Sequence, residues 1–129
     1  MEFNDTLMET LGIEMKTYDK DLIEMTMPVD ERTHQPFGFL HGGANVALAE
    51  SAASVGSFLH IDPNEVTVFG MEINANHIKS KRDGVVTAKA SPIHVGRTTM
   101  VWEIRIVDEE DILLCISRCT MGIVPRKKK

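Results

Sequence analysis

The chain has 129 residues, of which 43% are hydrophobic and 26% charged, and this balance is typical of one folded domain and excludes wholesale disorder. Fourteen basic side chains against 19 acidic ones leave a net charge of −5. Because nucleic-acid-binding proteins usually carry a basic balance, we expect no nucleic-acid partner. The basic run at the end, which we place in a tail over residues 125–129, is most simply a solvated terminus.

Export and membrane insertion are not predicted either. The N-terminus, MEFNDTLMETLGIEM, is acidic and lacks the basic start and apolar centre of a signal peptide. The most apolar stretch, 42–59, contains Asn45, Glu50 and serines, so it does not qualify as a membrane span. Cys115 and Cys119 are four residues apart in a predicted strand, roughly 13 Å, which is too far for a disulfide with each other. We therefore expect buried thiols and a cytoplasmic location.

The apolar periodicity predicts one long helix and several strands. Helical spacing over residues 3–11 indicates a short helix that ends at Gly12, and alternation over 21–29 indicates a strand. Residues 30–40 form a loop, and the small residues of 42–59 form the long helix. Four further strands are predicted over residues 65–78, 85–91, 98–107 and 112–123. Their short connections require antiparallel neighbours, so the class is α+β, with a sheet packed on a central helix.

Glu50 is the unusual residue of that helix. It is the only carboxylate between Arg32 and Asp62, and its own helix face carries alanines, serines and a glycine. An unpaired buried carboxylate costs several kcal/mol, so the side chain must be paired, hydrated in a cleft or protonated. A structural ion pair with Arg32, Lys79 or Arg97 is the simplest alternative to a catalytic role.

The helix begins with His41-Gly42-Gly43. The first amides of a helix lack an internal acceptor and carry the positive end of its dipole, so they suit an anion, and glycine lets a ligand approach closely. A capped helix beside a loop histidine explains the same residues without a ligand. Gln35 in the preceding loop could orient a carbonyl, or simply be solvated. The histidines lack metal-ligand spacing, and no phosphate-binding loop or nucleophile elbow occurs, so we expect neither metal nor cofactor.

Taken together, these segments resemble a known family. MPVDERTHQPFGFLHGGANVALAESAASVGS, GMEINANHIKS and SPIHVGR are similar to the hotdog-fold acyl-coenzyme A thioesterases, over residues 20 to 124. Within them, the branch that contains phenylacetate-pathway thioesterases, the Arthrobacter-type 4-hydroxybenzoyl-CoA thioesterase and 1,4-dihydroxy-2-naphthoyl-CoA hydrolase is the most similar. The specific signature is Q-P-F-G-x-L-H-G-G with a glutamate seven residues later. The resemblance implies one long central helix wrapped by an antiparallel sheet of five to six strands.

The resemblance also implies roles for individual residues. Glu50 would be the nucleophile or the general base, and Gly42 would donate its amide to the thioester oxygen, helped by Gln35 and His41. Ser54, one turn after Glu50, would position the carboxylate or the water. The segments that bind coenzyme A in the family, as part of the substrate and not as a cofactor, match Gly43, Gly70, His77, Ile78, Lys79, Ser80, His94, Val95, Gly96, Arg97, Thr98 and Thr99. Lys79 and Arg97 suit phosphates in charge and geometry, although each could equally be a solvated surface cation.

Two alternative functions use the same fold. A hotdog dehydratase acting on 3-hydroxyacyl thioesters also pairs a histidine with a carboxylate, but the HGG pattern is typical of thioesterases. A non-catalytic acyl-CoA sensor would carry a DNA-binding segment, for which 129 residues leave no room. The similarity of VDERTHQPFG and EINANHI favours the dihydroxynaphthoyl-CoA hydrolases of quinone biosynthesis, but the residues alone do not separate aromatic from aliphatic acyl groups.

Helix geometry predicts that the site is shared between two chains. Gly42 and Glu50 are eight residues apart, so their Cα atoms lie about 12 Å apart along the helix. A carbonyl held by the Gly42 amide would be too far from Glu50 of the same chain to react. An antiparallel second copy brings its Glu50 beside the first Gly42, so we expect a homodimer with two sites. As a separate expectation, two such dimers would associate as a dimer of dimers.

Overall fold

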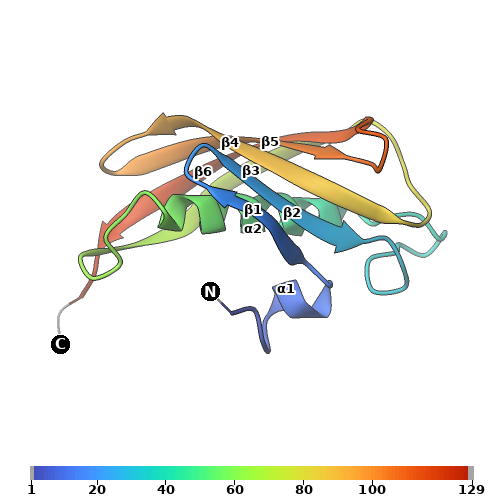
Figure 1. Cartoon of the computed structure of the whole chain (residues 1–129), viewed down its shortest axis with the longest axis horizontal. Coiled ribbons are helices and arrows are strands. Elements are labelled where there is room, and N and C mark those ends of the chain that lie inside the picture. The colour runs from blue at the N-terminus through green and yellow to red at the C-terminus, as the bar shows by residue number, and fades with distance from the viewer. Residues whose placement is uncertain (1, 128–129) are drawn as a thin grey trace.

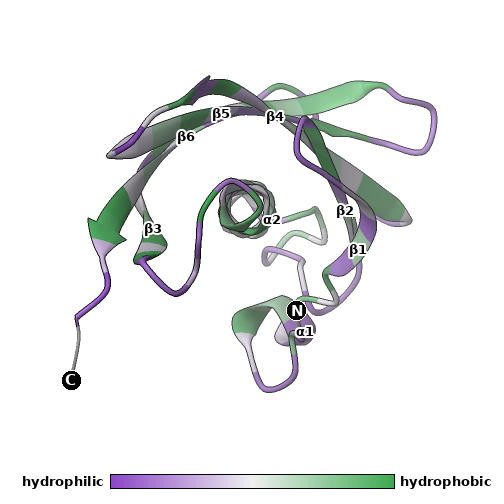
Figure 2. Cartoon of the chain, turned by 60° about the vertical axis from the view of Figure 1, so that its left-hand side comes forward, coloured by the Kyte–Doolittle hydropathy of each residue, from purple (hydrophilic) through white to green (hydrophobic). Residues whose placement is uncertain are grey.

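The fold is one antiparallel sheet curved around one long helix (Figure 1). The computed structural model describes residues 2–127. Its elements in chain order are α1 (Leu7–Thr10), β1 (Glu14–Asp19), β2 (Leu22–Pro28), α2 (Gly42–Phe58), β3 (Val66–His77), β4 (Val85–Val95), β5 (Thr99–Val107) and β6 (Leu113–Pro125). The strands lie in the order β1-β2-β4-β5-β6-β3, and Figure 2, viewed nearly along α2, shows the sheet bending around the helix. The predicted α+β architecture is confirmed.

Small residues let α2 lie directly on the centre of the sheet. Gly56 faces Trp102 of β5, and a Cβ at Gly56 would come within 2.5 Å of the indole ring. The Trp102 side chain is fully buried, and its Nε1–H donates to Ser57 Oγ at 2.8 Å. Because a buried indole N–H needs an acceptor, this bond fixes the rotation of the helix. The rotation in turn decides which residues of α2 face away from the sheet.

The N-terminal region differs from the prediction in one element. The helix within residues 3–11 is confirmed but short, and it ends as expected, with Gly12 at φ +74° donating to Glu9 O. The strand β1 is new, because the sequence EMKTYD alternates without any apolar residue that becomes buried. An edge strand paired on one side only does not need a buried face, so periodicity could not find it.

Two further strands are longer than predicted. β4 continues past Pro92 to Val95, with a register shift between Pro92 and His94, because a bulge accommodates the missing N–H. β6 includes Pro125, which we had placed in the tail. Arg126 is also held, since its NH1 donates to Pro63 O at 2.6 Å, whereas residues 128–129 of the predicted tail lie outside the described residues.

The predictions about the thiols and the membrane can be compared with the same structure. Cys115 and Cys119 are both buried and unpaired, as predicted. Burial raises the pKa of Cys119 to about 12, and the charges of Glu50 and Glu72 add to the effect. Among residues 2–127, no helix combines the length and apolar character that a membrane crossing needs.

Candidate active site

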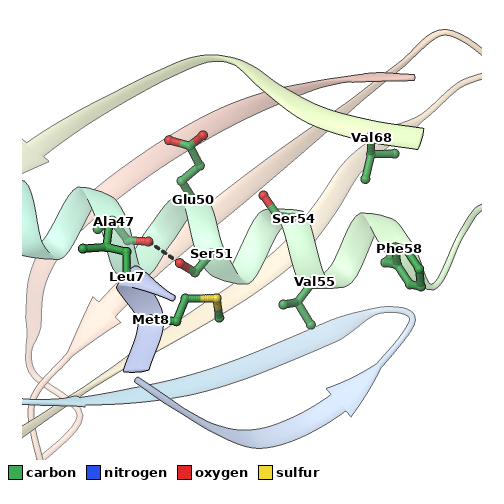
Figure 3. Close-up of a pocket in the computed structure, with 9 residues that line it drawn as sticks. All are labelled: Leu7, Met8, Ala47, Glu50, Ser51, Ser54, Val55, Phe58 and Val68. Atoms are coloured by element: carbon green, nitrogen blue, oxygen red, sulfur yellow. Dashed lines mark hydrogen bonds between the residues drawn. The ribbon is translucent and has the colours of Figure 1, made fainter. Parts of the chain in front are cut away.

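Glu50 and Ser54 project from α2 toward β3, where they form part of a hollow of about 480 Å³ (Figure 3). The floor of the hollow is α2, Val68 of β3 lies on one side, and Leu7 and Met8 of α1 lie on the other. The complete lining is Leu7, Met8, Ala47, Glu50, Ser51, Ser54, Val55, Phe58 and Val68. We call this the Glu50 hollow. It places one carboxylate among mainly apolar walls.

The Glu50 carboxylate is packed against the backbone of β3. A Cβ added at Gly70 would collide with Glu50 Oε2, so only glycine leaves room for the side chain in this position. The Glu50 carboxylate makes no hydrogen bond or ion pair with any other residue between 2 and 127, and Arg32, one of the expected partners, pairs with Asp30 at 2.7 Å. Of the three states expected for this side chain, the structure supports a half-buried carboxylate facing a cleft.

The two serines beside Glu50 differ in their hydrogen bonds. Ser51 Oγ donates to Ala47 O at 2.6 Å, so its hydroxyl is used by the helix. The recorded partner of Ser54 Oγ is the weak acceptor Met121 Sδ at 3.9 Å. Ser54 therefore keeps its hydroxyl available to a group in the hollow, as its predicted role requires.

The start of α2 leaves the amide of Gly42 free. His41 is the N-cap, and its Nδ1 accepts from the Gly43 amide at 2.8 Å. The next two amides, of Ala44 and Asn45, donate to His41 O at 3.0 and 3.3 Å. Within residues 2–127 the Gly42 N–H has no hydrogen-bond partner, at the positive end of a 17-residue helix. The cap thus uses His41 and Gly43 and leaves Gly42 as the donor.

A second hollow, of about 320 Å³, contains this free amide. Its lining is Gln35, Leu40, Gly42, Asn45, His77, Ile78, Lys79 and Ser80, so six of the predicted site residues meet here. Gln35 Oε1 accepts from the amides of Phe37 and Phe39 in its own loop, which leaves the Nε2 amide group free to donate. We call this the Gly42 hollow. It offers two N–H donors and contains no carboxylate.

Two residues of this hollow have further constraints. A Cβ on Gly42 would lie 2.9 Å from His77 Nε2, so the imidazole packs on the glycine. Asn45 is only 4% exposed, and its Oδ1 has no hydrogen-bond partner in the described part of the chain. Asn45 is not among the predicted site residues, although a polar side chain within a run of small residues is a signal in the sequence that marks it. The apolar walls from Leu7, Met8, Phe58 and Val68 were also missed, because they come from three separate elements.

Some predicted site residues lie elsewhere. His41 and Gly43 line a third hollow, on the α1 side of the helix, together with Leu7 and Ala47. The segment 94–99 forms the end of β4 and the turn into β5, and none of its residues lines these three hollows. The role of that segment in binding coenzyme A stays a prediction. Among residues 2–127, no group of three or more His, Cys, Asp and Glu side chains is placed to hold a metal ion.

Several known proteins of similar sequence are named as thioesterases or acyl-CoA hydrolases. Residues 37–115 match the model of the thioesterase superfamily. The chain is 53% identical to a 1,4-dihydroxy-2-naphthoyl-CoA hydrolase of Listeria monocytogenes over 122 residues, covering 95% of this chain and 98% of that protein. It is 49% identical to the enzyme of the same name in Escherichia coli, covering 88% and 83%. A crystal structure of a mutant thioesterase from Pseudomonas aeruginosa superposes with a TM-score of 0.92 at 47% identity, covering 95% and 88%.

Proposed function

Because this chain belongs to the thioesterase superfamily, we propose that it hydrolyses an acyl-coenzyme A thioester to the free acid and coenzyme A. The observation that carries the proposal is the free Gly42 amide, which shares a hollow with the free amide group of Gln35. Thioester hydrolysis passes through a tetrahedral oxyanion, and two preorganised N–H donors are what such an intermediate needs. In our proposal Glu50 attacks the thioester or activates water, and Ser54 positions the carboxylate or that water.

An aromatic acyl group is the substrate we favour, with 1,4-dihydroxy-2-naphthoyl-CoA as the best single candidate. Two relatives at about half identity carry that name, and each is covered over more than four fifths of its length. The mainly apolar walls of the Glu50 hollow fit a ring system, since ligand pockets combine apolar walls with few polar groups. Lys79, in the Gly42 hollow, and Arg97 are the cations we assign to the phosphates of coenzyme A.

We further propose that each reaction site combines the Glu50 hollow of one copy with the Gly42 hollow of a second copy. The two groups line different hollows of one chain, about 12 Å apart along α2. Glu50 packs against Gly70 and Gly42 packs against His77, and both of these contacts are in β3. The way in which the β3 strands of two copies pair would therefore decide whether the Glu50 of one copy lies beside the Gly42 of the other.

β3 is suited to such a pairing. It is a 12-residue edge strand that pairs only with β6 in the described chain, and it exposes Phe69 (48%) and Met71 (61%). Long open edges of this kind are usually covered in proteins. The register of β3 against β6 shifts between Gly70 and Glu72. If the β3 strands of two copies paired antiparallel about Asn74, this shifted position would lie opposite the second copy's His77. Each Glu50 would then lie beside the Gly42 of the other copy.

The test is to mix two inactive variants. Gly42→Pro removes the N–H at the first helical position, where proline is tolerated, and Glu50→Ala removes the carboxylate. In a shared-site dimer each mixed pair has one site with both defects and one with neither. Random pairing on co-refolding makes about half the dimers mixed, so hydrolysis of an aromatic acyl-CoA should return to about a quarter of wild type.

Activity is followed by release of the free thiol in the presence of EDTA, because we propose a reaction without a metal. Mixed dimers that form, as shown by a mass tag on one variant, and yet stay inactive would place the whole site in one chain. Activity that EDTA abolishes and zinc or magnesium restores would contradict the metal-free mechanism.

A further inference from the structure

The Glu50 hollow has a neighbour on the same side of the molecule. This third hollow has a volume of about 280 Å³ and is lined by Leu7, Leu11, Arg32, Thr33, His34, His41, Gly43, Ala44 and Ala47. It shares two residues with the Glu50 hollow, Leu7 of α1 and Ala47 of α2. These two side chains lie next to each other in Figure 3. The two hollows therefore adjoin each other along α2, with Leu7 and Ala47 at their common boundary, and together we call them the groove.

Leu7 is well placed to divide the groove, and it does not belong to the hydrophobic core. Its side chain is 62% exposed, which is high for a large apolar residue. The N-terminal segment is attached to the core by three other residues, Phe3, Met8 and Leu11. Of the two residues that line both hollows, Leu7 has the larger side chain, whereas Ala47 has only a methyl group.

We infer that Leu7 is a specificity-determining residue that forms the end wall of the acyl pocket and limits the length of the acyl group. This inference rests on the proposed hydrolysis, in which the thioester reacts at Glu50, one helical turn from Ala47. An aromatic acyl group fits into the hollow of about 480 Å³ before the wall. A long alkyl chain needs the additional volume of about 280 Å³ beyond it. Shortening Leu7 opens this extension, and enlarging it shortens the pocket.

The experiment measures kcat/KM of three enzymes, wild type, Leu7→Ala and Leu7→Trp, for benzoyl-, hexanoyl-, decanoyl- and tetradecanoyl-CoA. Single pocket contacts discriminate between acyl groups by about 10-fold or more. We expect the ratio of tetradecanoyl- to benzoyl-CoA to rise about 10-fold in Leu7→Ala and to fall in Leu7→Trp. Ile112→Ala is the matched control, because Ile112 is also an exposed apolar residue (39%) and lines none of the three hollows.

The possible outcomes separate the two proposals. Opposite shifts of the chain-length ratio in the two Leu7 variants, with the Ile112→Ala profile unchanged, support the inference. A wild-type enzyme that hydrolyses the series while both Leu7 variants keep its profile would overturn the inference and leave the hydrolase intact. Equal losses for every substrate, accompanied by a lower Tm, would show that Leu7 acts on stability and not on specificity. A wild-type protein that hydrolyses none of the four thioesters would overturn the proposed function itself.

Discussion

The Glu50 hollow and the Gly42 hollow, on one helix, differ in what they offer a substrate. The first has a carboxylate and apolar walls but no cation or free amide, and the second has free amide donors and Lys79 but no carboxylate. If one chain placed Glu50 next to the Gly42 amide, the carboxylate would accept that hydrogen bond itself. The separation keeps both groups unsatisfied within the chain, which is what the shared site that we propose requires.

The largest expected effect tests the carboxylate half of this comparison. Glu50→Gln keeps the shape and removes the charge, so we expect kcat to fall by about 10³ or more. Because Glu50 has no ion pair among residues 2–127, the free energy of unfolding of the Glu50→Gln protein should not be lower than that of the wild type. The measurements are steady-state kinetics and urea unfolding, with Glu110→Gln in the exposed turn between β5 and β6 as the control. Full turnover by Glu50→Gln would make the residue structural only.

The next effect tests the donor half. Gly42→Pro removes the free N–H, and loss of one oxyanion donor should lower kcat by about 10²–10³. The structure adds a complication, because any Cβ at this position lies 2.9 Å from His77 Nε2. Gly42→Ala is the matched control, since it adds the same Cβ and keeps the N–H. Equal losses of kcat in the two variants would assign the effect to the displaced imidazole and not to the missing donor.

A smaller effect tests how closely the carboxylate must be placed. The Cβ of Gly70→Ala collides with Glu50 Oε2, which is the end of a flexible side chain and can move aside. A displacement of about 1 Å can cost about 10²-fold in rate, so we expect kcat to fall by up to that factor while the fold is kept. Thr67→Ala, also exposed on β3, is the control, and circular dichroism checks the fold. Unchanged kcat would mean that the position observed for Glu50 is not the reactive one.

The parts of this comparison that could be predicted from sequence are the local ones. The length of α2 follows from residues that are neighbours in the chain, as does the placement of Gly42 at its start, and eight helical residues fix the separation from Glu50. The fold class follows from apolar periodicity, whereas the polar edge strand β1 has no such signal. The walls of the Glu50 hollow could not be predicted, because Leu7 and Val68 meet there only through the packing of distant elements.

The contacts that join the Gly42 hollow to other elements could not be predicted from the sequence either. Lys81 O accepts from the Leu40 amide at 2.8 Å, next to the loop of Gln35, and Lys81 Nζ pairs with Glu109 at 2.6 Å. Glu109 Oε2 also accepts from the Val85 amide at 3.0 Å. This ion pair supports the Gly42 hollow and has no contact with the Glu50 hollow, so it offers a way to disturb one half of the site alone.

The smallest expected effect comes from breaking this pair, and it depends on pH. The Lys81 ammonium, together with the Val85 amide, lowers the pKa of Glu109 from 4.5 to about 2. A lowered carboxylate pKa gives stability that is complete above about pH 4.5 and is lost as the pH falls through 2. Because the Glu109 side chain is 50% exposed, solvent screening limits the contribution to less than about 1 kcal/mol. Glu109→Gln should therefore lower the unfolding free energy slightly at pH 7, and the difference from wild type should close between pH 4.5 and 2. Urea unfolding across this pH range measures the difference in unfolding free energy, with the neighbouring Glu110→Gln as the control. A difference that persists at pH 2 would assign the effect to packing instead of charge.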